Sequence, residues 1–183
     1  KELRGVREAA AVLAAAHSAA PSPSRCSNRF GSCSWAVPAV AINNTFGVLG
    51  VAPNKELDVY IAKVFDASGS ASSFSVSAAM LGCLRSRSNV VNMSLGSDTP
   101  SRIMERVADL LASRNMLVVA AAGNNGTNGT GYPAGFASVM SVAAIDDTRT
   151  VASFSQHNAD VEIAAPGVAV LSTSAGLMTD REA

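Results

Sequence analysis

The sequence predicts an α/β domain built on a mostly parallel β-sheet that is flanked by helices. Runs of β-branched and aromatic residues alternate with helix-like segments along the chain. One run, residues 116–122, is almost continuously apolar, which is typical of a strand buried on both faces of a parallel sheet. Hydrophobic residues make up 48% of the 183 positions, enough to build a substantial core in one domain.

Strands and helices can be placed by their apolar patterns. Strands are predicted at residues 59–65, 89–95, 116–122, 139–145 and 161–164. A helix rich in small residues is predicted over 74–87, and a second begins after Pro100-Ser101 and ends near Asn115. The buried, core-facing side of this second helix is predicted to consist of Ile103, Val107, Leu110 and Leu111.

The first 36 residues differ from the rest of the chain in composition and in their pattern of apolar residues. Basic residues lead into an alanine-rich run, residues 9–16, and then into the breaker cluster Pro21-Ser22-Pro23-Ser24. This pattern favours a short amphipathic helix or a pro-region remnant over a signal peptide, because alanine is weakly apolar and Glu8 lies at the join. We therefore divide the chain into an irregular segment, residues 1–36, and a domain, residues 37–183.

Charge and cysteine content exclude several classes of protein. Acidic and basic residues balance at 14 each, so no single-sign field attracts nucleic acid or an anionic membrane. No apolar run approaches the roughly 20 residues of a membrane span. The three cysteines have no zinc-site spacing, which leaves either free thiols without a role or one disulfide with a thiol left over.

Glycine and polar residues follow three predicted strands, at 94–96, 123–126 and 165–167. The carboxyl ends of parallel strands meet at one edge of the sheet, where α/β domains bind ligands. An asparagine such as Asn124 could aim an amide donor at a developing oxyanion there. The alternative is that Asn124 only caps a turn.

Longer blocks around these strand ends resemble signature sequences of the subtilisin-like serine proteases. They include residues 90–96, VVNMSLG, and 118–124, VVAAAGN, with further matches at 43–53, 131–133, 152–155 and 164–168 in the family's order. The resemblance extends over residues 38–174. It implies the family's three-layer α/β fold, incomplete at both ends, and a serine endopeptidase that is secreted and acts on extended polypeptides.

The resemblance implies a role for each matching residue. Asn124 would be the oxyanion-hole asparagine. Residues 94–96 would pair with the substrate as an added strand, and residues 121–123 would form a wall of the primary specificity pocket. These substrate-binding residues are Ser94, Leu95, Gly96, Ala121, Ala122 and Gly123.

Residues 42–48 resemble the family's strong calcium loop. Calcium prefers several hard oxygen ligands. The family's additional aspartate and glutamine ligands have no counterpart upstream, so a site here would be weaker, and the alternative is a glycine-rich surface loop. The matching ligands would be the side chain of Asn44 and the backbone carbonyls of Ile42, Phe46 and Val48.

The family's Asp-His-Ser triad has no counterpart in these residues. No aspartate precedes Asp58, Gly31 occupies the position of the histidine, and no Gly-Thr-Ser-Met-Ala block occurs. His17 lies too early in the chain, and His157 is interpreted as an exposed loop residue. An oxyanion donor alone supplies neither nucleophile nor base, so we expect this chain to be inactive as given.

Three interpretations follow. Because the losses cluster at the two ends, we favour a truncated reading of an active protease gene. The second interpretation is a catalytically dead relative that binds extended peptides. The third is a nucleotide-binding domain, suggested by Gly69-Ser70-Ala71 after a strand, but these residues match neither phosphate-loop pattern.

Overall fold

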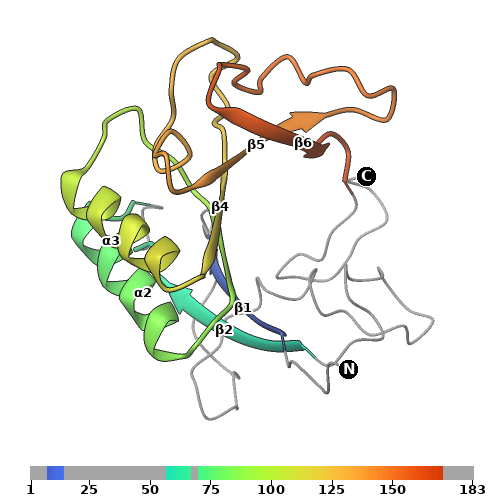
Figure 1. The fold of residues 1–183 in the computed structure, drawn as a ribbon. Helices are drawn as coiled ribbons and strands as arrows, with labels where there is room; N and C mark the ends of the chain where they lie inside the picture. Colours follow the sequence, from blue (N-terminus) through green and yellow to red (C-terminus); the bar gives the residue numbers. More distant parts are fainter. Residues whose placement is uncertain (1–7, 15–56, 67–69, 171–183) are drawn as a thin grey trace.

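The computed structural model describes residues 8–14, 57–66 and 70–170 (Figure 1). They form one six-stranded sheet in the order β2-β1-β3-β4-β5-β6, with every neighbouring pair parallel. The strands are β1 (Glu8–Ala14), β2 (Leu57–Lys63), β3 (Val90–Ser94), β4 (Leu117–Ala121), β5 (Met140–Ile145) and β6 (Val161–Pro166). The helices described are α2 (Ser73–Arg85) and α3 (Arg102–Ser113). The five predicted strands and both predicted helices are confirmed, with ends shifted by a few residues.

Strand β1 corrects the prediction for the start of the chain. Residues 8–14 form neither a helix nor an irregular segment but a strand that lies between β2 and β3 and pairs with both. Alanine favours helices in isolation, but tertiary pairing overrides this weak preference. Inserting β1 gives the backbone groups of β2 and β3 partners on the facing side.

Short polar residues set the ends of both helices. The Ser72 hydroxyl accepts a hydrogen bond from the Ser75 N–H at 3.0 Å at the start of α2, and Ser101 caps the Met104 N–H in the same way at the start of α3. Asn115 adopts a left-handed φ of 58° just after α3. Since such a residue cannot continue a helix, the predicted end of α3 is confirmed.

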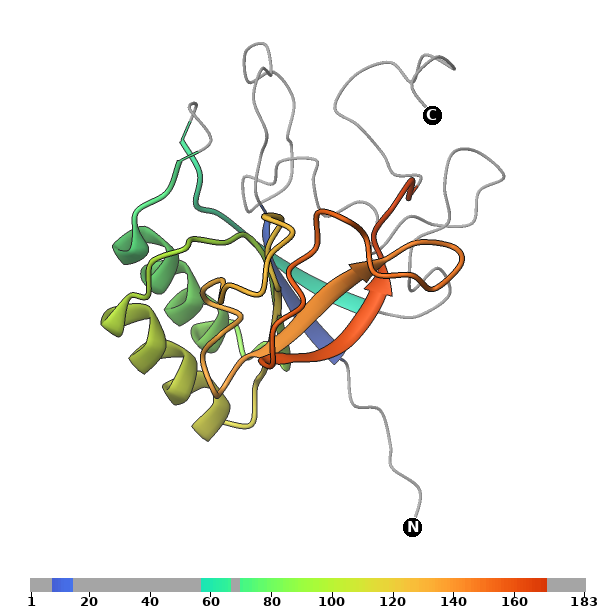
Figure 2. The same ribbon diagram turned by 90° about the horizontal axis from the view of Figure 1, so that it is seen from above.

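Both helices pack side by side on one face of the sheet (Figures 1 and 2). The core lies between the two layers, and its largest fully buried side chains include Met80, Met93, Leu111, Val91 and Val118. The described residues thus form two of the three expected layers. No helix of the described residues is long and apolar enough to cross a membrane.

The prediction of which α3 residues are buried was partly wrong. The buried residues are Met104, Ala108 and Leu111, at the i, i+4, i+7 spacing of one helical stripe. Ile103 lies beside this stripe and is 53% exposed. The helix therefore faces the sheet about one position later than its apolar pattern suggested.

The apolar sequence of β4 predicted a strand buried on both faces, but only one face is buried. Val118 and Ala120 face α2 and α3 and are buried, whereas Leu117 is 45% exposed and Ala121 is exposed. The reason is that the helices within the described residues cover only one face of the sheet (Figure 1).

Cys83 is predicted to resist alkylation. It is a fully buried free thiol on α2, and burial raises the pKa of its thiol from 9.0 to about 11. Because the unfolded chain would lose this proton first, the free energy of unfolding should fall as pH rises from about 9 to about 11.

Iodoacetamide labelling followed by peptide mapping should leave Cys83 unlabelled at neutral pH until denaturant is added. Complete labelling of the folded chain would contradict this burial.

Candidate active site

A cleft of about 490 Å³ lies where β3 and β4 end. It brings together the two segments that the sequence predicted to bind substrate and the asparagine that follows them. All seven of these predicted residues line it, although they come from two separate strand exits. The lining residues are Phe65, Ser94, Leu95, Gly96, Ser97, Asp98, Ala121, Ala122, Gly123, Asn124, Asn125, Gly131 and Gln156.

Gly123 forms the sharp turn at the exit of β4. Its φ of 121° lies in the region that favours glycine, and a Cβ built on it would overlap the Gln156 Oε1. The Gly123 carbonyl accepts a hydrogen bond from the Gln156 N–H at 3.0 Å. Only a residue without a side chain can therefore bring this backbone so close to the neighbouring loop.

Gln156 is a cleft residue that the sequence did not reveal. It is 2% exposed, and its Nε2 donates to the Gly129 carbonyl at 2.5 Å. A polar residue in a loop after Ser155 carries no pattern that indicates burial. The side chain fills the space beside Gly123 and ties the loop at Gly129 to the rear of the cleft.

Asn124 presents a free amide. Its side chain is exposed and makes no hydrogen bond to any residue that the structure describes. By contrast, Asn125 donates to Asp98 and Asn158 donates to the Gly129 carbonyl. The alternative that Asn124 caps a turn requires a hydrogen bond to nearby backbone, and that bond is missing. The amide is instead available to a ligand.

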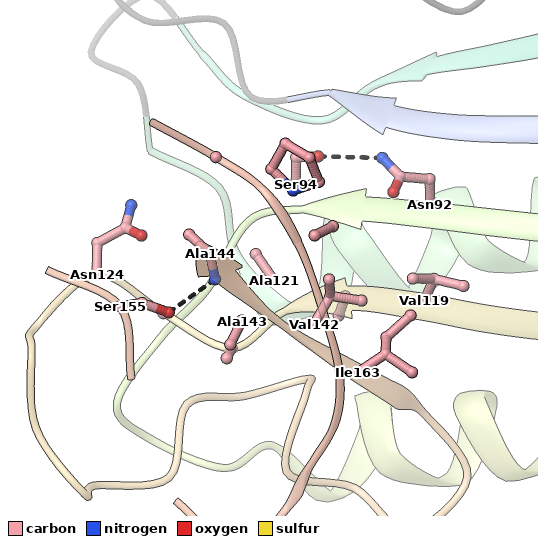
Figure 3. A pocket seen from close by; sticks show the side chains of 16 residues that line it. Asn92, Ser94, Val119, Ala121, Asn124, Val142, Ala143, Ala144, Ser155 and Ile163 are labelled. Atoms are coloured by element: carbon pink, nitrogen blue, oxygen red, sulfur yellow. Dashed lines mark hydrogen bonds between the residues drawn. The ribbon is translucent and has the colours of Figure 1, made fainter. Parts of the chain in front are cut away.

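Asn124 also lies at one end of a second cavity, of about 560 Å³, along the face of the sheet that the described helices leave uncovered (Figure 3). Apolar side chains of three strands line it, with Val119 from β4, Val142 from β5 and Ile163 from β6. The third predicted strand exit, residues 165–167, borders this cavity. The three exits therefore meet at one edge of the sheet, as predicted.

The segment after β3 offers backbone to a ligand. Ser97 and Tyr132 form an antiparallel pair through bonds of 2.9 and 2.8 Å, which holds the segment in place. The preceding residue, Gly96, is exposed, and its backbone groups make no hydrogen bond within the described part of the chain. An extended peptide could pair here as an added strand.

Comparison with known proteins decides the family. The subtilase family model matches residues 35–182. The chain belongs to the subtilase family. It is 47% identical over 136 residues to an alkaline protease of Alkalihalobacillus alcalophilus, covering 74% of this chain and 35% of the relative. It is 46% identical to subtilisin Savinase of Lederbergia lenta, covering 74% of this chain and 50% of the relative.

Solved structures agree with this assignment. A psychrophilic subtilisin-like protease of Pseudoalteromonas sp. AS-11 aligns with a TM-score of 0.68 at 41% identity, covering 72% of this chain and 30% of that one. The prenylagaramide maturation protease shares the fold, with a TM-score of 0.71 at 24% identity, over 88% of this chain and 63% of that one. This subtilase chain spans half or less of the length of the two curated relatives named above.

The remaining predictions for this subtilase concern the calcium loop and His157. The calcium-loop residues Ile42, Asn44, Phe46 and Val48 lie outside the described residues. Among the residues that are described, no group of three or more His, Cys, Asp or Glu side chains could hold a metal ion. His157 is exposed, with its Nδ1 3.1 Å from the Ser155 carbonyl oxygen, so its interpretation as a loop residue is confirmed.

Proposed function

We propose that the protein containing this chain is a subtilisin-like serine endopeptidase, and that these residues supply its substrate cleft and oxyanion donor. The observation that carries the proposal is the free amide of Asn124 at the mouth of a cleft shared by residues 94–96 and 121–123. Family membership supports the same chemistry. Nucleophile and base would come from sequence beyond the printed residues.

In this proposal the substrate binds as an extended strand beside Gly96. Main-chain hydrogen bonds would hold it without regard to sequence, since Gly96 has unpaired backbone groups within the described residues. The side chain before the scissile bond would enter the cleft between Leu95 and Ala122. Small residues in that wall leave room for a large side chain.

Asn124 would then stabilise the tetrahedral intermediate. When the scissile carbonyl is attacked, negative charge develops on its oxygen. The Asn124 amide N–H would donate to that oxygen, and it needs no prior bond to be broken because it has no partner among the described residues. A donor aimed at this developing charge lowers the barrier of the chemical step.

Calcium binding and secretion are also part of the proposal. A calcium ion would be held by Asn44 and the carbonyls of the loop around it, and it would supply structural stability rather than chemistry. Secretion follows the family resemblance. A higher melting temperature of the chain in calcium than in chelator would support calcium binding. The same melting temperature in both would contradict calcium binding.

A pair of assays tests the function. The 183-residue chain should bind an extended peptide without hydrolysing it. A longer gene product should hydrolyse a chromogenic peptide with a large apolar residue before the scissile bond, and a serine-directed inhibitor should block it. A longer product that folds and binds peptide but never cleaves it would favour the alternative, a catalytically dead peptide-binding relative.

A further inference from the structure

Among the described residues that line the cleft, Asp98 is the one with a charged side chain. It follows β3, on the wall opposite Asn125, which follows β4. The Asn125 Nδ2 donates to the Asp98 Oδ1 at 2.9 Å, a bond between residues 27 positions apart. This bond joins the two walls of the cleft at the carboxylate.

The charge of Asp98 is not neutralised by the described residues. No lysine, arginine or histidine among them lies within salt-bridge distance of it, and its Oδ2 makes no hydrogen bond to them. The side chain is exposed, so a ligand can reach the free oxygen. The remaining lining of the cleft is apolar or neutral.

The position of this carboxylate is set from two directions. Its backbone follows Ser97, which is paired with Tyr132 through two hydrogen bonds, and Ser97 Oγ also accepts from the Thr99 N–H at 3.1 Å. Its side chain is held by Asn125. The carboxylate is therefore ordered before a ligand arrives, which reduces the entropy lost on binding.

We propose that Asp98 is a specificity-determining residue that makes the cleft prefer a peptide side chain ending in a cation, lysine or arginine, over a neutral or acidic one. This inference rests on the proposed function of the cleft. The aliphatic stem of such a side chain would lie against Leu95 and Ala122, and its charge would meet the free oxygen of Asp98. Glutamate at the same peptide position would be repelled.

The size of the effect follows from exposure. An exposed ion pair changes affinity only modestly, so we expect a preference of about two- to fivefold for lysine over an uncharged residue of similar length. Salt should weaken this preference because it screens exposed charges. The preference for a long side chain itself should persist, since it depends on the apolar walls.

The test is a titration of the isotope-labelled 183-residue chain with blocked peptides that differ at one position, lysine, norleucine or glutamate, followed by NMR. Resonances of Gly123 and Asn124 report binding in the cleft. The variant Asp98→Asn removes the charge and keeps the shape. The matched control Asp147→Asn removes one charge from an exposed turn outside the cleft.

The expected result is the affinity order lysine, norleucine, glutamate, abolished in Asp98→Asn, retained in Asp147→Asn, and reduced at about 0.5 M salt. Equal affinities, with cleft resonances still perturbed, would overturn the role of Asp98 and leave the proposed function standing. If no peptide perturbs the cleft resonances of the folded chain, the cleft does not bind peptide, and both proposals are wrong.

Discussion

Replacing Gly123 with alanine is expected to destabilise the chain by about 3–5 kcal/mol, enough to unfold a marginally stable domain. Two independent causes act together. The φ of 121° is strained for any residue with a side chain, and the new Cβ would overlap the Gln156 Oε1. Gln156 is 2% exposed and bonded to the Gly129 carbonyl, so it cannot move aside freely. Denaturant unfolding monitored by circular dichroism measures the loss.

Gly96→Ala is the matched control. A Cβ at Gly96 would lie 3.8 Å from the Tyr132 carbonyl oxygen, an ordinary contact, so stability should change by no more than about 1 kcal/mol. The double variant Gly123→Ala/Gln156→Ala separates the two causes. Removing the overlap should make the pair of substitutions less costly than the sum of the single ones. Strict additivity would mean that strain at Gly123 alone accounts for the effect.

Asn124→Ala in an active longer product is expected to lower kcat by about 10²–10³ with little change in KM. That magnitude is the one known for removing an oxyanion-hole donor from subtilisin, and we adopt it rather than derive it. The donor acts on charge that develops only in the transition state, so substrate binding should survive its loss. Steady-state kinetics with a chromogenic peptide measure both parameters.

The matched control for this prediction is Asn128→Ala, an exposed asparagine in the same loop that does not line the cleft. It should leave kcat and KM unchanged. Stability should also be unaffected by Asn124→Ala, since the side chain has no partner among the described residues. A loss of kcat that tracks a loss of folded protein would contradict an oxyanion role and indicate a structural one.

Local pattern was sufficient for much of the fold. Runs of apolar and β-branched residues located β2, β3, β4, β5 and β6, and Pro100-Ser101 located the start of α3. The carboxyl ends of parallel strands lie at one sheet edge, so the meeting of residues 94–96 with residues 123–126 was predictable from the order of the strands. Ala121 and Ala122 were added by the family resemblance. Seven of the residues that line the cleft were therefore predicted, whereas Asp98 and Gln156 were not.

The sequence by itself determined the α/β class and the strand exits, because periodicity and turn chemistry are local properties of the chain. Local pattern left Asn124 open between a turn cap and an oxyanion donor, and only the family resemblance favoured the donor. Only the tertiary structure showed that residues 8–14 pair between β2 and β3, that one face of β4 is uncovered by the described helices, and that Gln156 is buried against Gly123. Each of these depends on contacts between residues far apart in sequence. Local propensity carries no information about such contacts, and pairing or packing overrides it when the two disagree.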